Sequence, residues 1–197
     1  MPTKDQVEAL LPQTQCQRCE YTGCSPYAEA VANEGAPINK CAPGGAFVLE
    51  KLAGIQGRKP TQKEIDGLES ERMWKAYIDP NRCIGCYKCV DVCPTAAIVG
   101  HNKSLHGVLE DLCTGCGLCL PTCPMDCIEE RDSHETLEGR WERKNIFQKA
   151  YEEKQQRQTK KKNELKKTQT KLRQKKSTRE ETLAARQALF QQWVSSE

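Results

Sequence analysis

Aromatic residues are scarce in this sequence, at 6% of 197 residues, and the hydrophobic share is only 37%. Long apolar runs are also missing, because no stretch approaches the roughly 18 apolar residues that a membrane-spanning helix requires. Cysteine is absent from the last seventy residues. This is poor material for a large packed core, so we expect disulfides or metal to hold the rest of the chain together.

The first residues, MPTKDQVEALLPQTQ, lack the basic and apolar segments of a secretory signal. We therefore expect a soluble cytoplasmic protein without a membrane anchor. Thirteen cysteines nevertheless lie between Cys16 and Cys127. Because disulfides are disfavoured in a reducing compartment, these cysteines are expected to bind metal.

The net charge of +3 hides a strong division along the chain. Residues 154 to 179 contain twelve Lys and Arg residues and a single acid, Glu164. The remaining residues include 18 basic and 26 acidic side chains, a balance of −8. The sequence therefore predicts an acidic, cysteine-rich body with a basic tail.

A repeat occurs at an offset of thirty residues. Sliding the sequence by that amount lays RCIGCYKCVDVCP (82–94) on LCTGCGLCLPTCP (112–124). Each copy has the pattern C-x2-C-x2-C-x3-C-P, and Gly85 also falls on Gly115. So many coincidences within one spacing rule indicate a duplicated unit.

The spacing of these cysteines favours an iron–sulfur cluster over zinc. A structural zinc site normally uses two separated cysteine pairs, whereas three cysteines at two-residue intervals wrap three iron atoms of a 4Fe–4S cluster. In two-cluster proteins of this spacing, the fourth cysteine of each copy binds the other cluster. The expected ligands of cluster I are Cys83, Cys86, Cys89 and Cys123. Those of cluster II are Cys113, Cys116, Cys119 and Cys93.

Through this motif, residues 74 to 131 resemble the bacterial two-cluster 4Fe–4S ferredoxins. The resemblance implies a pseudo-twofold α+β unit, with WKAYIDP and GVLED on strands that lead into the cysteine loops. No residue in this unit looks like a general acid, a general base or a nucleophile. The implied chemistry is one-electron transfer by the clusters, without a catalytic pocket.

A third group of cysteines lies upstream, in LLPQTQCQRCEYTGCSPYAEAVANEGAPINKCAPGG. Between its last two cysteines we expect a short helix, capped by Ser25 and ended by Gly35, that brings the four sulfur atoms together. The spacing alone allows either a zinc site or a third 4Fe–4S cluster. The members of this group are Cys16, Cys19, Cys24 and Cys41.

This upstream segment, followed by CAPGG and the two-cluster unit, resembles the B subunit family of Rnf/Rsx-type electron transport complexes. The resemblance covers about residues 7 to 131. It implies a third 4Fe–4S cluster, here called the N-terminal cluster, on the four upstream cysteines. It also implies that the protein passes electrons between redox proteins, membrane-bound subunits of such a complex among them. The basic tail lies outside the shared region, and the membrane-anchoring segment common in that family is not seen.

Cys127 remains once twelve cysteines have been assigned. Its counterpart in the first repeat is Ala97, so we expect a small buried residue beside a cluster and not a ligand. The three histidines, His101, His106 and His134, are expected in loops or at the surface.

The sequence therefore predicts an α+β protein with three 4Fe–4S clusters. Its expected parts are a small N-terminal 4Fe–4S domain (1–50), a linker (51–73) with one helix around TQKEIDGLESERMW, the two-cluster domain (74–131) and a charged, partly disordered helical tail (132–197). We expect it to relay single electrons between a donor and an acceptor protein, in the cytoplasm or peripherally at the cytoplasmic face of the inner membrane. The alternative is a metal-stabilised binding module whose basic tail docks an acidic partner or nucleic acid. Nucleic acid is the weaker option, because residues 154 to 179 have no interleaved aromatic side chains.

Overall fold

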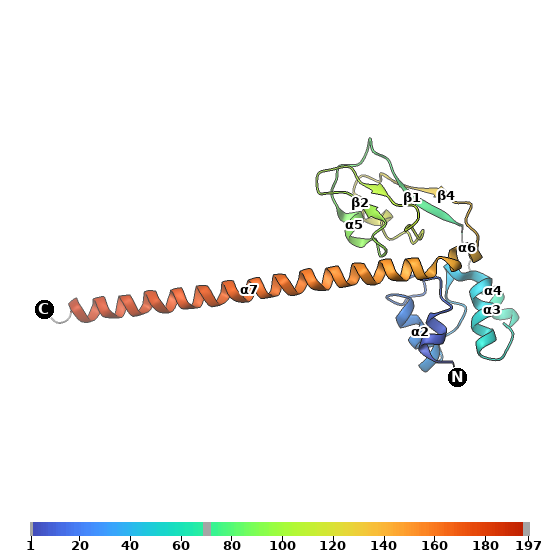
Figure 1. The fold of residues 1–197 in the computed structure, drawn as a ribbon, viewed down its shortest axis with the longest axis horizontal. Helices are drawn as coiled ribbons and strands as arrows, with labels where there is room; N and C mark the ends of the chain where they lie inside the picture. The colour runs from blue at the N-terminus through green and yellow to red at the C-terminus, as the bar shows by residue number, and fades with distance from the viewer. Residues whose placement is uncertain (1, 69–71, 195–197) are drawn as a thin grey trace. The chain divides into compact units, whose positions relative to one another are not determined.

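The computed structural model describes residues 2–68 and 72–194, without the side chains of residues 177, 189, 190 and 192–194. Figure 1 shows helices, two small sheets and a long C-terminal helix. This confirms the predicted mixture of helix and strand. The chain divides into two compact units, Met1–Lys154 and Gln155–Glu197.

The N-terminal part of the first unit is helical. Its elements are α1 (Lys4–Glu8), α2 (Cys24–Asn33), the 3-10 turn η1 (Ala42–Gly44), α3 (Gly45–Ile55) and α4 (Gln62–Asp66). Tyr27, Val48 and Leu52 belong to the buried cluster that joins these helices. The predicted cap residue Ser25 lies inside α2, because that helix already begins at Cys24.

The segment expected as a linker contains regular structure. Helix α3 continues through the expected boundary at residue 50 and ends at Ile55. Helix α4 begins with a capping box, in which the Thr61 hydroxyl accepts from the backbone N–H of Glu64 and the Glu64 carboxylate accepts from that of Thr61. This reciprocal pair satisfies two N–H groups that a helix start leaves without partners.

Two small antiparallel sheets follow. Strand β1 (Trp74–Ile78) pairs with β4 (Ile128–Asp132), and β2 (Ile98–Val99) pairs with β3 (Gly107–Val108). The short helix α5 (Lys88–Val92) and the 3-10 turn η2 (Leu120–Thr122) lie in the cysteine-rich segments. Strand β1 alternates buried and half-buried side chains, as expected for a strand with one face on a core.

The backbone repeats at the same offset as the sequence. The N–H of Asp79 donates to the carbonyl of Cys127 at 2.9 Å, and its counterpart in Leu109 donates to the carbonyl of Ala97 at 2.7 Å. Left-handed φ values recur with the same spacing, and a non-glycine residue adopts them only where the surrounding structure compensates. The pairs are Gly85 and Gly115, Tyr87 and Gly117, and Ala96 and Asp126. The two halves are therefore structural copies of one another.

The residues after β4 return to the N-terminal helices. They form α6 (Leu137–Glu142) and the start of α7 (Lys144–Val194). The Trp141 indole N–H donates to the carbonyl of Leu10 at 2.8 Å, and the Lys144 ammonium donates to that of Ala9 at 2.5 Å. Phe147, one turn further on, is completely buried. The first compact unit consequently extends to Lys154.

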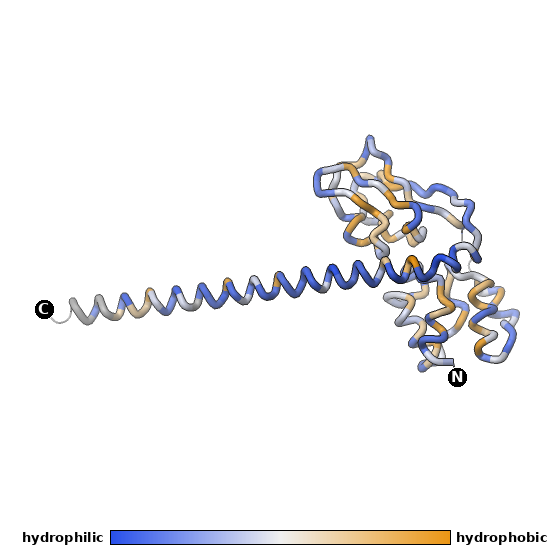
Figure 2. Tube along the Cα trace, viewed as in Figure 1, coloured by the Kyte–Doolittle hydropathy of each residue, from blue (hydrophilic) through white to orange (hydrophobic). Residues whose placement is uncertain are grey.

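The second unit consists of the remainder of α7. Figure 2 shows this helix as almost uniformly hydrophilic. Its few apolar residues with described side chains, Leu165, Leu172 and Leu183, are about half exposed or more. Within the described residues, no helix is both long enough and apolar enough to cross a bilayer.

Substitution of Phe147 by alanine tests the attachment of α7 to the first unit. Removing a fully buried phenylalanine side chain costs about 3–5 kcal/mol, which lowers the thermal unfolding midpoint by on the order of 10 °C for a chain of this size. Its neighbour Ile146 is 51% exposed, so Ile146→Ala should leave the midpoint nearly unchanged. Similar midpoints for the two variants in scanning fluorimetry would contradict this packing.

Gly115 offers a second test, at a tight turn of the repeat. It has φ of +66°, and a Cβ there would collide with the carbonyl oxygen of Trp74. Gly35 has a similar φ of +71° but nothing within 4 Å of a Cβ. Gly35→Ala should therefore lower the free energy of unfolding by only about 1–2 kcal/mol, the cost of a left-handed backbone for a residue with a Cβ. We expect Gly115→Ala to lower the unfolding midpoint clearly further, and an equal loss in both variants would show that the turn can relax.

Candidate metal centres

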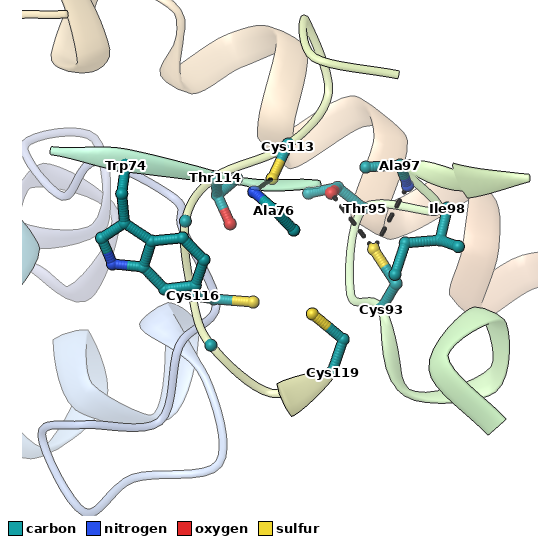
Figure 3. A pocket seen from close by; sticks show the side chains of 12 residues that line it. Trp74, Ala76, Cys93, Thr95, Ala97, Ile98, Cys113, Thr114, Cys116 and Cys119 are labelled. Atoms are coloured by element: carbon teal, nitrogen blue, oxygen red, sulfur yellow. Dashed lines mark hydrogen bonds between the residues drawn. The ribbon is translucent and has the colours of Figure 1, made fainter. Parts of the chain in front are cut away.

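Four sulfur atoms point into one space beside β1, as Figure 3 shows. They belong to the cysteines predicted for cluster II, a set here called site II: Cys93, Cys113, Cys116 and Cys119. The space measures about 320 Å³, including its opening to solvent, and its other lining residues are largely apolar. Cys93 comes from the first repeat and the other three from the second, so the structure brings together side chains from both halves.

Backbone N–H groups are aimed at the sulfur atoms of site II. The N–H of Ala97 donates to Cys93 Sγ at 3.2 Å, and the N–H of Ala76 donates to Cys113 Sγ at 3.4 Å (Figure 3). Such bonds stabilise negative charge on a thiolate and are one of the means by which a protein tunes an iron–sulfur cluster.

The cysteines predicted for cluster I line a second, similar space of about 270 Å³, here called site I. They are Cys83, Cys86, Cys89 and Cys123. His106 also lines this space, with Nδ1 3.6 Å from Cys89 Sγ and 3.8 Å from Cys83 Sγ. His106 lies in a loop, as expected, but its side chain is buried. Nothing in the sequence around His106 distinguished it from the other two.

Cys127 lies in site I beside an expected ligand. Its sulfur is 3.4 Å from Cys123 Sγ, and its N–H donates to the same atom at 3.5 Å. Burial, and then the hydrogen bond with Cys123, raise the pKa of the Cys127 thiol to about 12. Cys127 is therefore a buried thiol that can donate its S–H toward Cys123.

The upstream cysteines form a third group, here called the N-terminal site. Burial raises the pKa of the Cys41 thiol well above its ordinary value, and three neighbouring thiols add to this effect when ionised. These neighbours are Cys24, Cys16 and Cys19. Cys24 occupies the first turn of α2, and Cys41 immediately precedes η1. The structure thus places all four cysteines of the predicted set close enough to interact electrostatically.

Two buried glutamines shape the loop before Cys16. The side-chain oxygen Oε1 of Gln15 accepts from the backbone N–H of Cys24 at 3.0 Å. The side-chain Nε2 of Gln15 donates to Oε1 of Gln13 at 2.8 Å. The Gln13 amide in turn donates to the carbonyl of Glu8 at 3.1 Å. Both glutamines have positive φ, as does Gln17, so the loop carries three left-handed residues at alternate positions. The PQTQC sequence was the only signal for this role.

Burial opposes ionisation at all three sites. It raises the pKa of Cys24 and Cys119 to about 12 and that of Cys89 and Cys116 to about 11. Metal ligation requires thiolates, so these groups fit a cofactor that supplies strong positive charge. All thirteen cysteines are free thiols. Without Cys127, which is not an expected ligand, twelve are available to bind metal. The donor sets therefore fit iron–sulfur clusters.

Two cations from the C-terminal helices approach site II. The Lys154 ammonium donates to the carbonyls of Cys93 and Asp91, at 2.5 and 2.6 Å. The Arg140 guanidinium is buried and lies 3.5 Å from the position of a Cβ on Gly115. In the sequence, Lys154 looked like the first member of the exposed basic run, and Arg140 lay outside the expected cluster domain.

Comparison with known proteins agrees with this geometry. Residues 76–130 match a family model described as a 4Fe–4S dicluster domain. Residues 11–43 match a second model, described as a putative Fe–S cluster. The two matches cover all the cysteines of the three sites.

Curated relatives cover much of the chain. The B subunit of an ion-translocating oxidoreductase complex from Cronobacter sakazakii is 49% identical over 147 residues, which is 74% of this chain and 77% of that protein. The corresponding protein of Yersinia pestis is 53% identical over 131 residues, or 65% and 69% of the two chains. That of Shewanella pealeana is 51% identical over 111 residues, or 56% and 57%. The chain therefore belongs to the Rnf/Rsx-type B subunit family of ion-translocating oxidoreductase complexes.

Proposed function

We propose that this iron–sulfur electron-transfer protein relays single electrons through three 4Fe–4S clusters. The N-terminal site would hold the N-terminal cluster, site I cluster I and site II cluster II. When bound, such clusters accept and release one electron each. The chain itself supplies the thiolate ligands, the N–H groups that face the sulfur atoms and the enclosure that limits access of water.

The exchange of cysteines between the repeats is the observation that carries this proposal. Cys93 lies in the first motif but lines site II, and Cys123 lies in the second motif but lines site I. A crossed arrangement is the ligation pattern of two-cluster proteins with this spacing. It makes each site depend on both halves, so binding at one site supports the fold of the other.

A family match supports iron over zinc at the N-terminal site. A zinc ion draws its sulfur ligands to about 2.3 Å from one centre. Residues 11–43, which include all four cysteines of the N-terminal site, instead match a family model described as a putative Fe–S cluster. This match supports a 4Fe–4S cluster there.

The partners that we propose are other redox proteins. The curated relatives are named as subunits of an ion-translocating oxidoreductase complex, and we propose that this chain also works within a multi-subunit redox complex. The exposed basic side chains of α7 suit electrostatic contact with an acidic protein surface or with the cytoplasmic face of a membrane. Nucleic-acid binding by this helix is not favoured, because residues 154 to 179 have no interleaved aromatic side chains.

Reductive titration tests the electron-transfer function directly. Protein prepared without oxygen should take up about three electrons per chain, one for each cluster, and release them on reoxidation. EPR spectra recorded at each step should show the paramagnetic reduced clusters. A Cys19→Ala variant, which lacks a ligand of the N-terminal site, should take up one electron fewer. Uptake of no electrons by protein with a full metal content would contradict the proposal.

The crossed ligation has its own test at Cys93. Serine in place of a cysteine ligand should shift or abolish the EPR signal of the cluster that it binds. We expect Cys93→Ser to change the same signal as Cys116→Ser, a ligand of site II, although Cys93 is nearer in sequence to site I. The matched variant Cys86→Ser should change the other signal. If Cys93→Ser and Cys86→Ser alter the same signal, ligation is not crossed.

A further inference from the structure

The two copies of the repeat differ most clearly at one position. The residue after the first cysteine of the motif is Ile84 in the first copy and Thr114 in the second. Ile84 is 58% exposed, whereas Thr114 is only 3% exposed. Equivalent backbone positions thus have opposite environments, so something outside the repeat must cover the second copy.

The covering segment is the loop of the N-terminal site. The Thr114 hydroxyl donates to the carbonyl of Thr14 at 3.1 Å, in a buried hydrogen bond between residues one hundred positions apart. Thr14 stands two residues before Cys16, and Thr114 directly follows Cys113. One hydrogen bond therefore links the ligand loop of the N-terminal site to the ligand loop of site II.

Two side chains from outside the repeat also contact the ligand segments of site II. Arg140 of α6 lies beside Gly115, and Lys154 of α7 donates to the carbonyl of Cys93. A Cβ on Gly85, the counterpart of Gly115, would instead meet Ser104 and Lys103 of the repeat itself. The N-terminal loop and the C-terminal helices thus cover the ligand loops of site II, where three of the four cysteines are buried: Cys93, Cys113 and Cys119. In site I, three of the four are only half-buried: Cys83, Cys86 and Cys123.

We propose that Thr114 is a positioning residue that docks the N-terminal site on site II. Of the two sites in the repeat, site II then exchanges electrons with the N-terminal site, and site I is the one left accessible to an external redox protein. This inference rests on the proposed function, because it concerns the order of three bound clusters. The physical reason is that electron transfer slows steeply with distance, so the site nearest the N-terminal loop dominates the exchange.

The order can be tested by removing the N-terminal cluster. In fully reduced protein, neighbouring paramagnetic clusters broaden each other's EPR signals and shorten their relaxation times. Cys19→Ala should narrow the signal that Cys116→Ser identifies as cluster II, and it should leave the signal that Cys86→Ser identifies as cluster I nearly unchanged. Narrowing of the cluster I signal alone, or of both signals equally, would overturn the inference.

Thr114 variants test the positioning residue in protein that keeps all its cysteines. Thr114→Val removes the hydroxyl at nearly constant volume, and Thr114→Ser retains it. Thr95→Val is the control for a lost hydroxyl beside site II, because the Thr95 hydroxyl donates to the carbonyl of Leu112 at 2.7 Å and lies 3.9 Å from Cys93 Sγ. It can alter the signal of cluster II, but it leaves the hydrogen bond between Thr114 and Thr14 in place. We expect only Thr114→Val to weaken the coupling between the N-terminal cluster and cluster II, with Thr114→Ser close to the parent protein.

Hydrogen exchange supplies a readout that does not depend on electron transfer. Loss of this hydrogen bond should speed exchange of the amides in residues 13–17 about fivefold, the factor that corresponds to about 1 kcal/mol. Thr95→Val should leave these amides unchanged. Unaltered exchange and unaltered coupling in Thr114→Val would overturn the assignment of Thr114, as would faster exchange with full coupling.

The failure of this inference can be told apart from the failure of the proposed function. Three reducible clusters with the N-terminal cluster coupled to cluster I would refute this inference alone. Absence of reducible clusters would refute the proposed function.

Discussion

Burial of ionisable thiols is the constraint on which the rest of this structure depends. Burial raises the pKa of Cys24 and Cys119 to about 12, so the thiolates needed for ligation are costly there without a strong counter-charge. A bound cluster supplies that charge. Because the apolar clusters of the first unit are small, metal binding contributes directly to folding. With the proposed crossing of Cys93 and Cys123, each cluster would also tie the two halves of the repeat together.

The surroundings of the repeat break its internal symmetry. Matching hydrogen bonds and left-handed turns show that the two halves share one backbone plan. Three residues from outside the repeat contact the ligand segments of site II: Thr14, Arg140 and Lys154. The positive charge of Lys154 favours the more negative, reduced state of site II, whereas the charge of Arg140 is offset by the Glu135 carboxylate at 3.6 Å. Segments that look peripheral in the sequence therefore determine how two otherwise similar sites differ.

The sequence predicted three groups of cysteines from ligand spacing, because that spacing is a local property that a short loop must satisfy. The resemblance to two-cluster ferredoxins implied the antiparallel strand pairs and a strand before each cysteine loop, and the structure has both. The sequence did not indicate the buried glutamines, His106 or Arg140, because their roles arise from contacts between distant segments. Lys154 shows why: within a run of twelve basic residues, nothing local separates the one that is buried from those that are exposed.

Metal and sulfide content tests the central claim most directly. Protein purified without oxygen should contain about twelve iron atoms and about twelve acid-labile sulfides per chain if all three sites hold 4Fe–4S clusters. About eight irons with one zinc would contradict the assignment of the N-terminal site and leave a two-cluster protein with a structural zinc domain. Zinc without iron or sulfide would contradict the whole account.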